Sequence, residues 1–412
     1  MLFYFSSIAA LFSLCRRLNS DRTAWWAVVF TLLQPLTILA GGRAGGDSTA
    51  WGLAMWFIYF SYRMINDGGL WWPAAILTGC LSAITKAPFF MAAGLTAFFW
   101  LWLRQKWSIR AWLFLSSSGI VSVLACLAWN FHCQKIYAEA EFPTIDLNPY
   151  HAGGGVNHWY FGSLAYRLDI HNWMRGGWHM MALVFGSLSF ILFILLSVRL
   201  KRSSEAWLFL LAAGCTTLVF TPLLLEHDHY FFIVAPPVAW LCAISATEFE
   251  FEIWNRLRAS TITRIAILLV VFAASLAETY MAIHFNLNFD NYQATIGRTI
   301  EQHTASTDKI IVWGLNWGDP FLRANRDGLT GGLGLDDSGW LNNPDNLQRL
   351  KQLGYDRIAF ANPSPFIVAL TSVAGKHGEK LVDLHEHLPA VATNWPVVFD
   401  STQLLILKIP EE

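Results

Sequence analysis

The sequence predicts a polytopic membrane protein made mainly of α-helices, with a soluble α/β domain at its C-terminal end. Of its 412 residues, 55% are hydrophobic and only 14% are charged, whereas soluble domains carry roughly 25% charged residues. The shortage of charge is confined to residues 1–285, because 286–412 has an ordinary polar composition. Long apolar runs also recur through the first of these segments. We therefore predict a transmembrane domain at 1–285 and a soluble domain at 286–412.

A spanning helix needs about 17–25 mostly apolar residues, and the first domain contains about ten candidate runs near that length, of which the first and the fourth are short. We predict spans at residues 2–15, 23–40, 50–65, 70–85, 87–103, 111–129, 178–198, 206–224, 229–247 and 264–284. Several prolines fall in or near them, where neighbouring helices can shelter a kinked backbone. The 21 Trp and 30 Phe fit a chain that crosses many membrane interfaces.

The orientation follows from the Lys and Arg residues in the connections, since the richer side of a membrane protein faces the cytoplasm. Up to residue 285, one set of loops holds thirteen of these residues and the other set holds five. This count places the 130–177 loop and the C-terminal domain outside the cytoplasm. In that domain we expect helices at 291–304 and 346–353, strands at 309–314 and 357–361, and a hairpin of 397–399 with 404–409.

Charge and cysteine usage exclude some classes of protein. The net charge is −1 and no basic block is present, so we expect no nucleic-acid partner. All six cysteines lie in or beside apolar runs and none lies in the C-terminal domain, which argues against a disulfide framework there. The first apolar run has no charged segment before it, so we expect no removable signal peptide.

Ionisable groups near membrane depth are costly, and are candidates for function. The first group lies between the second and third predicted spans, in the segment Gly41–Asp47. Its four glycines would let a backbone approach a ligand closely, Arg43 could hold a phosphate, and Asp47 could bond a sugar hydroxyl. Alternatively, the segment is a flexible turn in which Asp47 caps the next helix.

The second group is Lys86, in the sequence Thr85-Lys86-Ala87-Pro88. It is the only charged residue between Gly68 and Leu103. Because the turn is tight, its ammonium should lie close to the membrane surface, where an anionic lipid headgroup would suit it. A snorkelling interfacial lysine is the alternative.

The third group is Glu226-His227-Asp228-His229-Tyr230, at the outer end of the ninth predicted span. Two histidines beside carboxylates could bind a metal or supply acid–base groups. A solvated turn is the alternative. The predicted topology places all three groups on the outer side of the membrane, which favours one shared site.

The order of these motifs resembles the bacterial relatives of protein O-mannosyltransferases and of the lipid A aminoarabinose transferase, in the GT-C superfamily. The resemblance covers about residues 1–285. It rests on Arg16-Arg17-Leu18 at a helix end, and on Pro35 before the outward Arg43 and Asp47. It also rests on Thr85-Lys86-Ala87-Pro88, and on the polar segment from His227 that runs into Pro236-Pro237.

This resemblance implies a membrane glycosyltransferase that moves a sugar from a polyprenyl-phosphate carrier to a glycan, lipid or protein acceptor. Transfer would occur on the outer face of a bacterial inner membrane. A departing lipid phosphate needs a cation near its developing charge, and an attacking hydroxyl needs a base. We therefore expect Asp47 to be the catalytic carboxylate. We expect the substrate to be bound by Arg43, Lys86, His227, Asp228, His229 and Tyr230. No cofactor is expected, and a divalent metal is left open.

One departure from the family pattern concerns the N-terminal region. Family members begin with an extra span and an outer loop that holds the aspartate thought to be the general base. Here no Asp or Glu precedes Asp21, which lies on the cytoplasmic side in the predicted topology. We expect either a missing N-terminal region or a degenerate family member, and the short first span favours the former.

Two other functions compete with this one. A transporter or flippase of a lipid-linked sugar would gather binding groups near mid-membrane, but the spans at 111–129 and 206–224 contain no ionisable residue. A non-catalytic envelope protein, whose α/β domain binds a partner, is the third possibility.

Overall fold

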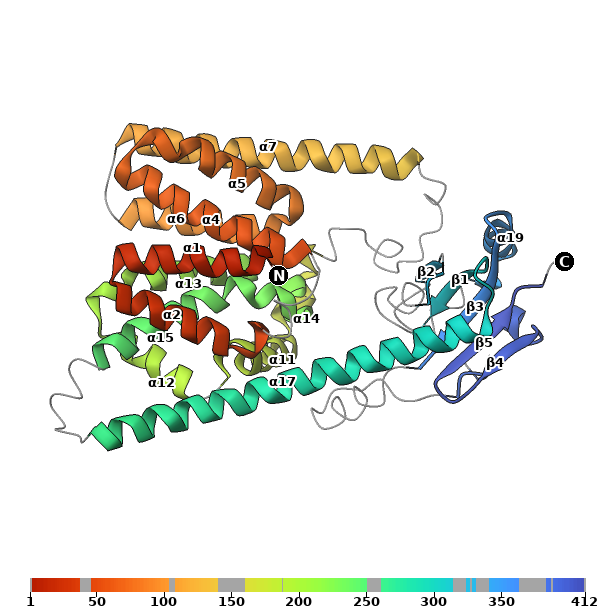
Figure 1. The fold of residues 1–412 in the computed structure, drawn as a ribbon. Helices are drawn as coiled ribbons and strands as arrows, with labels where there is room; N and C mark the ends of the chain where they lie inside the picture. Colours follow the sequence, from red (N-terminus) through yellow and green to blue (C-terminus); the bar gives the residue numbers. More distant parts are fainter. Residues whose placement is uncertain are drawn as a thin grey trace. The chain divides into compact units, whose positions relative to one another are not determined.

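The structure is a computed structural model of the chain (Figure 1). It describes residues 2–37, 46–103, 108–139, 160–186, 188–249, 261–313, 324–326, 328–330, 341–362, 383–386 and 388–410. Its contacts divide the chain into two compact units, one of residues 1–138 and 157–283 and the other of 139–156 and 284–412. The first unit is helical, and the second contains the sheet.

The first unit begins with helices that lie side by side (Figure 1). They are α1 (Leu2–Leu18), α2 (Asp21–Leu33), α4 (Gly46–Asp67), the 3₁₀ turn η1 (Gly69–Trp71), α5 (Trp72–Thr85), α6 (Ala87–Leu103) and α7 (Ile109–Glu139). Helix α1 packs against α2 and α4, and α4 also packs against α5 and α6. Helix α2 begins at a side-chain cap, because the Ser20 hydroxyl accepts a hydrogen bond from the backbone N–H of Thr23.

The second half of this unit contains shorter elements. They are α10 (Leu164–Leu168), α11 (Ile170–Met180), the π-helical turn η2 (Met181–Phe185), α12 (Leu188–Ser197), the 3₁₀ turn η3 (Lys201–Ser203), α13 (Ser204–Val219), α14 (Thr221–Glu226), the 3₁₀ helix η4 (Asp228–Ile233) and α15 (Ala235–Glu248). Helix α15 packs against α2, α12 and α13. All of its residues from Ala235 to Ala246 are buried, so α15 is the central helix of the unit.

Small residues allow these helices to approach one another closely. Ala24 and Ala27 on α2, and Ala50 and Ala54 on α4, have no exposed surface. Close approach through small residues is typical of helices packed within a membrane, where helix association rests on van der Waals contact.

Three predicted spans are interrupted in the structure, each at a Gly or Pro. The 178–198 run breaks at Gly186, whose φ of 54° is left-handed and suits a residue without a Cβ. The 206–224 run breaks after Val219, just before Pro222. The 229–247 run becomes α-helical only at Ala235, where Pro236 and Pro237 occupy the first helical turn.

The last predicted span and the helix expected at 291–304 are one continuous helix, α17 (Thr261–His303). Residues 285–290 contain neither Pro nor Gly, so no residue type that breaks helices separates the two segments. Among the described helices, only Ile109–Cys133 within α7 is both long and apolar enough to cross a bilayer by itself. The number of spans therefore stays a prediction.

The second unit contains a five-stranded sheet in the order β2-β1-β3-β5-β4 (Figure 1). Its elements are β1 (Lys309–Trp313), β2 (Gly328–Thr330), α19 (Pro344–Gln352), β3 (Tyr355–Ala361), the 3₁₀ turn η7 (Ala390–Ala392), β4 (Val397–Asp400) and β5 (Leu404–Lys408). Strands β2, β1 and β3 are parallel, whereas β3, β5 and β4 are antiparallel. The helix predicted at 346–353, the two strands and the hairpin are present, whereas the helix predicted at 291–304 is the end of α17.

The sheet is buried on both faces. Ile311, Ile358 and Leu407 belong to one core cluster, together with Leu350 of α19. Ile310, Ala359 and Ile406 belong to another, together with side chains from the end of α17. This alternation follows from the two-residue period of a strand.

Candidate functional site

Three polar segments that are far apart in the sequence meet in the helical unit. Asp47 lies in the first turn of α4, Lys86 lies between α5 and α6, and His229 and Tyr230 lie in η4. Helix α4 packs against α5, and both α4 and α6 contact η4. Residues from the three segments therefore come together within the described part of the unit.

The backbone holds Lys86 firmly in the turn between its two helices. Its N–H donates to the Ser82 carbonyl at 2.8 Å, and its own carbonyl accepts from the Phe89 N–H at 3.2 Å. Its φ of −158° and ψ of 106° are extended, so the chain leaves the helical conformation at Lys86 before α6 begins at Ala87. The Ser82 hydroxyl also donates to the Ala50 carbonyl at 3.0 Å. This last bond ties α5 to α4 one turn from Asp47.

The central contact of the site is an ion pair between Lys86 Nζ and Asp47 Oδ1. The side chains are 28% and 21% exposed, respectively, whereas the paired oxygen, Asp47 Oδ1, is itself buried. His229 Nε2 lies 3.8 Å from the same Asp47 oxygen. The ammonium, the carboxylate and the imidazole are therefore close enough to act on one ligand.

An aromatic ring lies beside the ammonium, and two other rings pack on that ring. Lys86 Nζ lies 4.8 Å from the centroid of the Tyr230 ring, within the range of a cation–π contact. The Tyr230 ring lies 4.7 Å from the His229 ring and 5.3 Å from the Phe89 ring, between centroids. These contacts hold in place the Tyr230 ring beside which the ammonium lies. We call the rings of Phe89, His229 and Tyr230 the aromatic wall.

Phe89 is a site residue that the sequence analysis did not identify. It is fully buried, and it packs on Trp51 of α4 as well as on Tyr230. Its only sequence signal is its place three residues after Lys86, about one helical turn further along. Phenylalanine is so common in this chain that the spacing alone could not have distinguished it.

The remaining predicted residues are placed only in part. The His227 ring lies 5.3 Å from that of His229 and 6.3 Å from that of Tyr230, between centroids. Asp228 begins η4, but its side chain lies outside the described part of the structure, and Arg43 lies outside the described residues altogether. Within the described ranges, no group of three or more His, Cys, Asp or Glu is arranged to hold a metal ion.

The helix ends add to the electrostatics of the site. Asp47 is near the positive end of the 22-residue helix α4, and Lys86 follows the negative end of α5. Asp47 therefore has the sign that its helix dipole favours, whereas Lys86 lies between the negative end of α5 and the positive end of α6. An anion that approached Lys86 would compete with the Asp47 carboxylate for the ammonium, so the arrangement can exchange an internal partner for a bound one.

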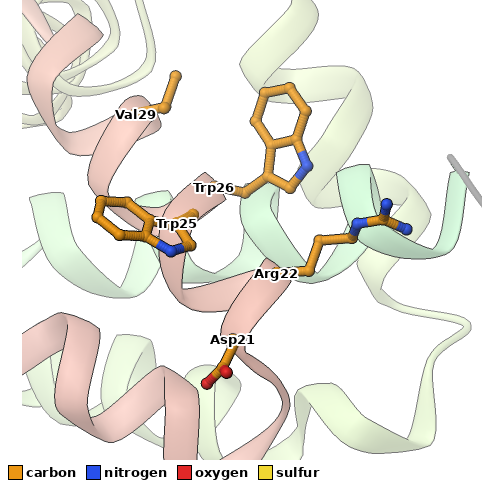
Figure 2. A pocket seen from close by; sticks show the side chains of 5 residues that line it. All are labelled: Asp21, Arg22, Trp25, Trp26 and Val29. Carbon is orange, nitrogen blue, oxygen red and sulfur yellow. The ribbon is translucent and has the colours of Figure 1, made fainter.

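An open hollow of about 360 Å³ lies elsewhere in the structure (Figure 2). Its lining comes entirely from the start of α2 and comprises Asp21, Arg22, Trp25, Trp26 and Val29. Asp21 pairs with Arg16 at the end of α1, and the adjacent Arg17 pairs with Asp67 at the far end of α4 from Asp47. With 22 residues, α4 separates the two places by about 30 Å. The hollow is therefore not part of the candidate site.

No family model and no curated protein sequence matches the chain. Solved structures do. Apo ArnT from Cupriavidus metallidurans aligns with a TM-score of 0.58 and 13% identity, over 99% of this chain and 82% of ArnT. Arabinofuranosyltransferase AftD from Mycobacteria aligns with a TM-score of 0.46 and 16% identity, over 100% of this chain and 33% of AftD.

The oligosaccharyltransferase AglB from Archaeoglobus fulgidus, solved with an inhibitory peptide and a dolichol-phosphate, aligns with a TM-score of 0.40 and 12% identity. The match covers 86% of this chain and 57% of AglB. Of these three likenesses, that to ArnT is the one strong enough to establish an architecture, because its TM-score exceeds 0.5 over nearly the whole chain. The chain therefore has a fold similar to that of ArnT, and the resemblance expected from the sequence is confirmed at the level of the fold.

Proposed function

We propose that this chain is a membrane glycosyltransferase that moves a sugar from a polyprenyl-phosphate carrier to a glycan, lipid or protein acceptor. The observation that carries the proposal is the convergence of Asp47, Lys86, His229 and Tyr230. These residues come from three segments. The order of these segments in the sequence resembles that in transferases with a lipid-phosphate donor. The fold shared with ArnT supports the same class of protein.

Lys86 would bind the carrier phosphate. Its ammonium is partly exposed and is already held against a carboxylate and an aromatic face. A lysine acts on phosphate as a compact point charge, and its attraction grows as negative charge develops on the leaving group. Phosphate binding would draw Lys86 away from Asp47 by competing for the same ammonium.

No Asp or Glu precedes Asp21 in this chain, so we propose Asp47 as the base in place of the family's N-terminal aspartate. Once Lys86 turns to the phosphate, the carboxylate can accept the proton of the acceptor hydroxyl. A bond forms between that hydroxyl oxygen and the anomeric carbon of the sugar, while the bond from this carbon to the phosphate oxygen breaks. The electron pair leaves with the polyprenyl phosphate, and the proton stays on Asp47.

His229 and Tyr230 would shape the same site, and His227, Asp228 and Arg43 are proposed to complete the binding of the donor. The lipid-linked donor carries its own leaving group, so we propose no cofactor. The charge count of thirteen against five supports transfer at the outer face of a bacterial inner membrane, with the C-terminal domain on the same side.

A binding experiment tests the proposal at its first step. Purified protein in detergent is heated with a polyprenyl phosphate, or with the neutral polyprenol of the same length. The phosphate should raise the unfolding temperature more than the alcohol, because only the phosphate offers a charge to Lys86. Equal effects of the two lipids would contradict a phosphate site.

A transfer assay tests the second step. Labelled sugar on a polyprenyl-phosphate donor should pass to an acceptor in detergent, without a sealed compartment. Movement of the donor across intact vesicles, with no transfer in detergent, would instead identify a transporter. The same assay with a chelator shows whether a divalent metal takes part.

A further inference from the structure

Helices α10 and α11 each expose large apolar side chains. On α11, Ile170, Met174 and Trp178 follow one another at intervals of four residues and are 63%, 65% and 70% exposed. Because an interval of four returns to nearly the same side of a helix, they form one face. Leu164 and Leu168 of α10 have the same spacing and are also exposed. We call these five residues the apolar stripe.

The opposite face of α11 is packed against the protein. A Cβ added to Gly176 would lie 2.3 Å from Leu225 Cδ2 of α14, so the two helices touch at this glycine. Trp173 Nε1 donates to the Arg167 carbonyl at 2.7 Å, and Asn172 Nδ2 donates to the Tyr166 carbonyl at 3.1 Å. The stripe is therefore carried by a firmly held helix.

Arg167 anchors the pair of helices to the end of α13. Its guanidinium donates to the Phe161 carbonyl at 2.5 Å and to the Val219 carbonyl at 2.9 Å. The second bond satisfies a carbonyl at the C-terminus of α13. The helix dipole also favours a cation at this end of the helix. The charge of Arg167 thus acts within the protein, while the leucines on either side of it face outward.

A polar edge borders the stripe. On a helical projection of α11, His171 lies next to Trp178 at one edge of the stripe, and Arg175 lies between that edge and the packed face. A helix with an apolar face and a cationic polar edge is typical of segments that lie in the plane of a membrane interface. Trp178, near the end of α11, is a residue type that collects at such interfaces.

The chain itself indicates what covers the stripe. Directly after α11 it continues through η2 into α12, whose sequence Leu188–Ser197 contains no charged residue and exposes Leu195. The apolar surface of α11 is therefore continuous in sequence with a predicted membrane span. A bilayer covers such a surface along its whole length, whereas a partner protein would have to cover α12 as well.

We infer that α10 and α11 lie in the membrane interface, with the apolar stripe among the acyl chains and the polar edge at the headgroups. Leu225, which Gly176 contacts, comes two residues before His227, and α11 also contacts η4. Through these contacts, the interfacial helix holds the His227–Tyr230 segment at headgroup depth. The interfacial contact itself does not depend on the proposed transfer.

Photo-crosslinking in a bilayer tests the inference. Benzoylphenylalanine is placed singly at Met174 or Trp178 of the full chain, which is reconstituted into nanodiscs of phosphatidylethanolamine and phosphatidylglycerol. Control positions are Gln302 at the end of α17 and Gln352 at the end of α19, which are also exposed. After irradiation, phospholipid adducts are counted by mass spectrometry, and size-exclusion chromatography checks that each variant is folded.

We expect lipid adducts at positions 174 and 178 to exceed those at the controls by about tenfold. Adducts that join two copies of the chain at these positions would overturn the inference in favour of an oligomer interface. Lipid adducts no more frequent than at the controls would also overturn it, because the stripe would then face water.

Discussion

Lys86 and Asp47 form an ion pair that joins the turn between α5 and α6 to the first turn of α4. In this pair, two groups of opposite charge lie together at one partly exposed place. Each neutralises the other, and Tyr230 supports the ammonium from the side. The proposed function requires this pair to open when a phosphate arrives, and the variants below test that requirement.

Replacement of Lys86 by Ala should abolish the preference for polyprenyl phosphate over polyprenol. In a transfer assay, losing one such contact typically costs about 3–4 kcal/mol, or roughly 100- to 1000-fold in rate. Lys86→Arg should recover only part of this, because a planar guanidinium does not replace a compact ammonium. Wild-type preference and rate in Lys86→Ala would exclude Lys86 from the phosphate site.

Asp47→Asn separates a structural role from a chemical one. Asp47 lies inside the first turn of α4 and is not its N-cap residue, and Asn matches Asp in size, so folded yield by size-exclusion chromatography should stay close to normal. Transfer should fall by roughly 100-fold or more, because the amide cannot accept the proton of the acceptor. Polyprenyl phosphate should still bind, since Lys86 keeps its charge. An unchanged transfer rate would leave Asp47 with a structural role only.

Tyr230 provides a test of the aromatic wall. Tyr230→Phe keeps the ring that lies 4.8 Å from Lys86 Nζ and should bind polyprenyl phosphate nearly as well as the wild type. Tyr230→Leu removes a contact worth about 1 kcal/mol, and phosphate binding should weaken roughly fivefold. If Phe and Leu weaken binding equally, the hydroxyl rather than the ring is the important group.

Two adjacent glycines of α11 form a matched pair. A Cβ at Gly176 would lie 3.1 Å from Leu225 Cα, whereas a Cβ at Gly177 would have nothing within 4 Å. Gly176→Ala should therefore displace α14 and η4 and weaken polyprenyl-phosphate binding several-fold. Gly177→Ala, which adds the same methyl group to the same helix, should leave binding unchanged. Similar binding by both variants would show that α11 does not position the His227–Tyr230 segment.

Tyr292 gives the second unit a distinctive pH dependence. Its hydroxyl donates to the Asn362 carbonyl at 2.6 Å, and burial raises the pKa of Tyr292 because it disfavours the phenolate. The unfolded chain releases this proton at the ordinary value of about 10, while the folded unit retains it. The contribution of Tyr292 to stability should therefore be fully present below pH 10 and should be lost as the pH rises above it.

Tyr292→Phe checks that assignment. At neutral pH it should lower the free energy of unfolding of this unit by about 1 kcal/mol, the usual contribution of one hydrogen bond. It should also remove the tyrosine's share of the fall above pH 10. The measurement is thermal unfolding from pH 8 to pH 11. If the stability of Tyr292→Phe falls as steeply as that of the wild type, groups other than Tyr292 cause the fall.

The sequence predicted the elements well wherever one local pattern decided them. Strands β1 and β3 and the hairpin of β4 and β5 follow from short apolar runs between turn residues, and they lie where expected. The pattern was less informative where helices break. Gly186 and Pro222 interrupt long apolar runs, and hydropathy alone does not show which glycine or proline will do so, because packing against neighbouring helices decides whether a kink is tolerated.

By itself, the sequence determined that 1–285 is too apolar for water, that 286–412 is not, and that Asp47, Lys86 and His227–Tyr230 are polar exceptions within apolar surroundings. Only the tertiary structure decided that Lys86 pairs with Asp47 and rests on Tyr230, and that Phe89 belongs to the aromatic wall. The physical reason is that such contacts depend on how helices distant in sequence pack. The Ser82–Ala50 hydrogen bond between α5 and α4 sets Lys86 opposite Asp47, and no local pattern of residues records that alignment.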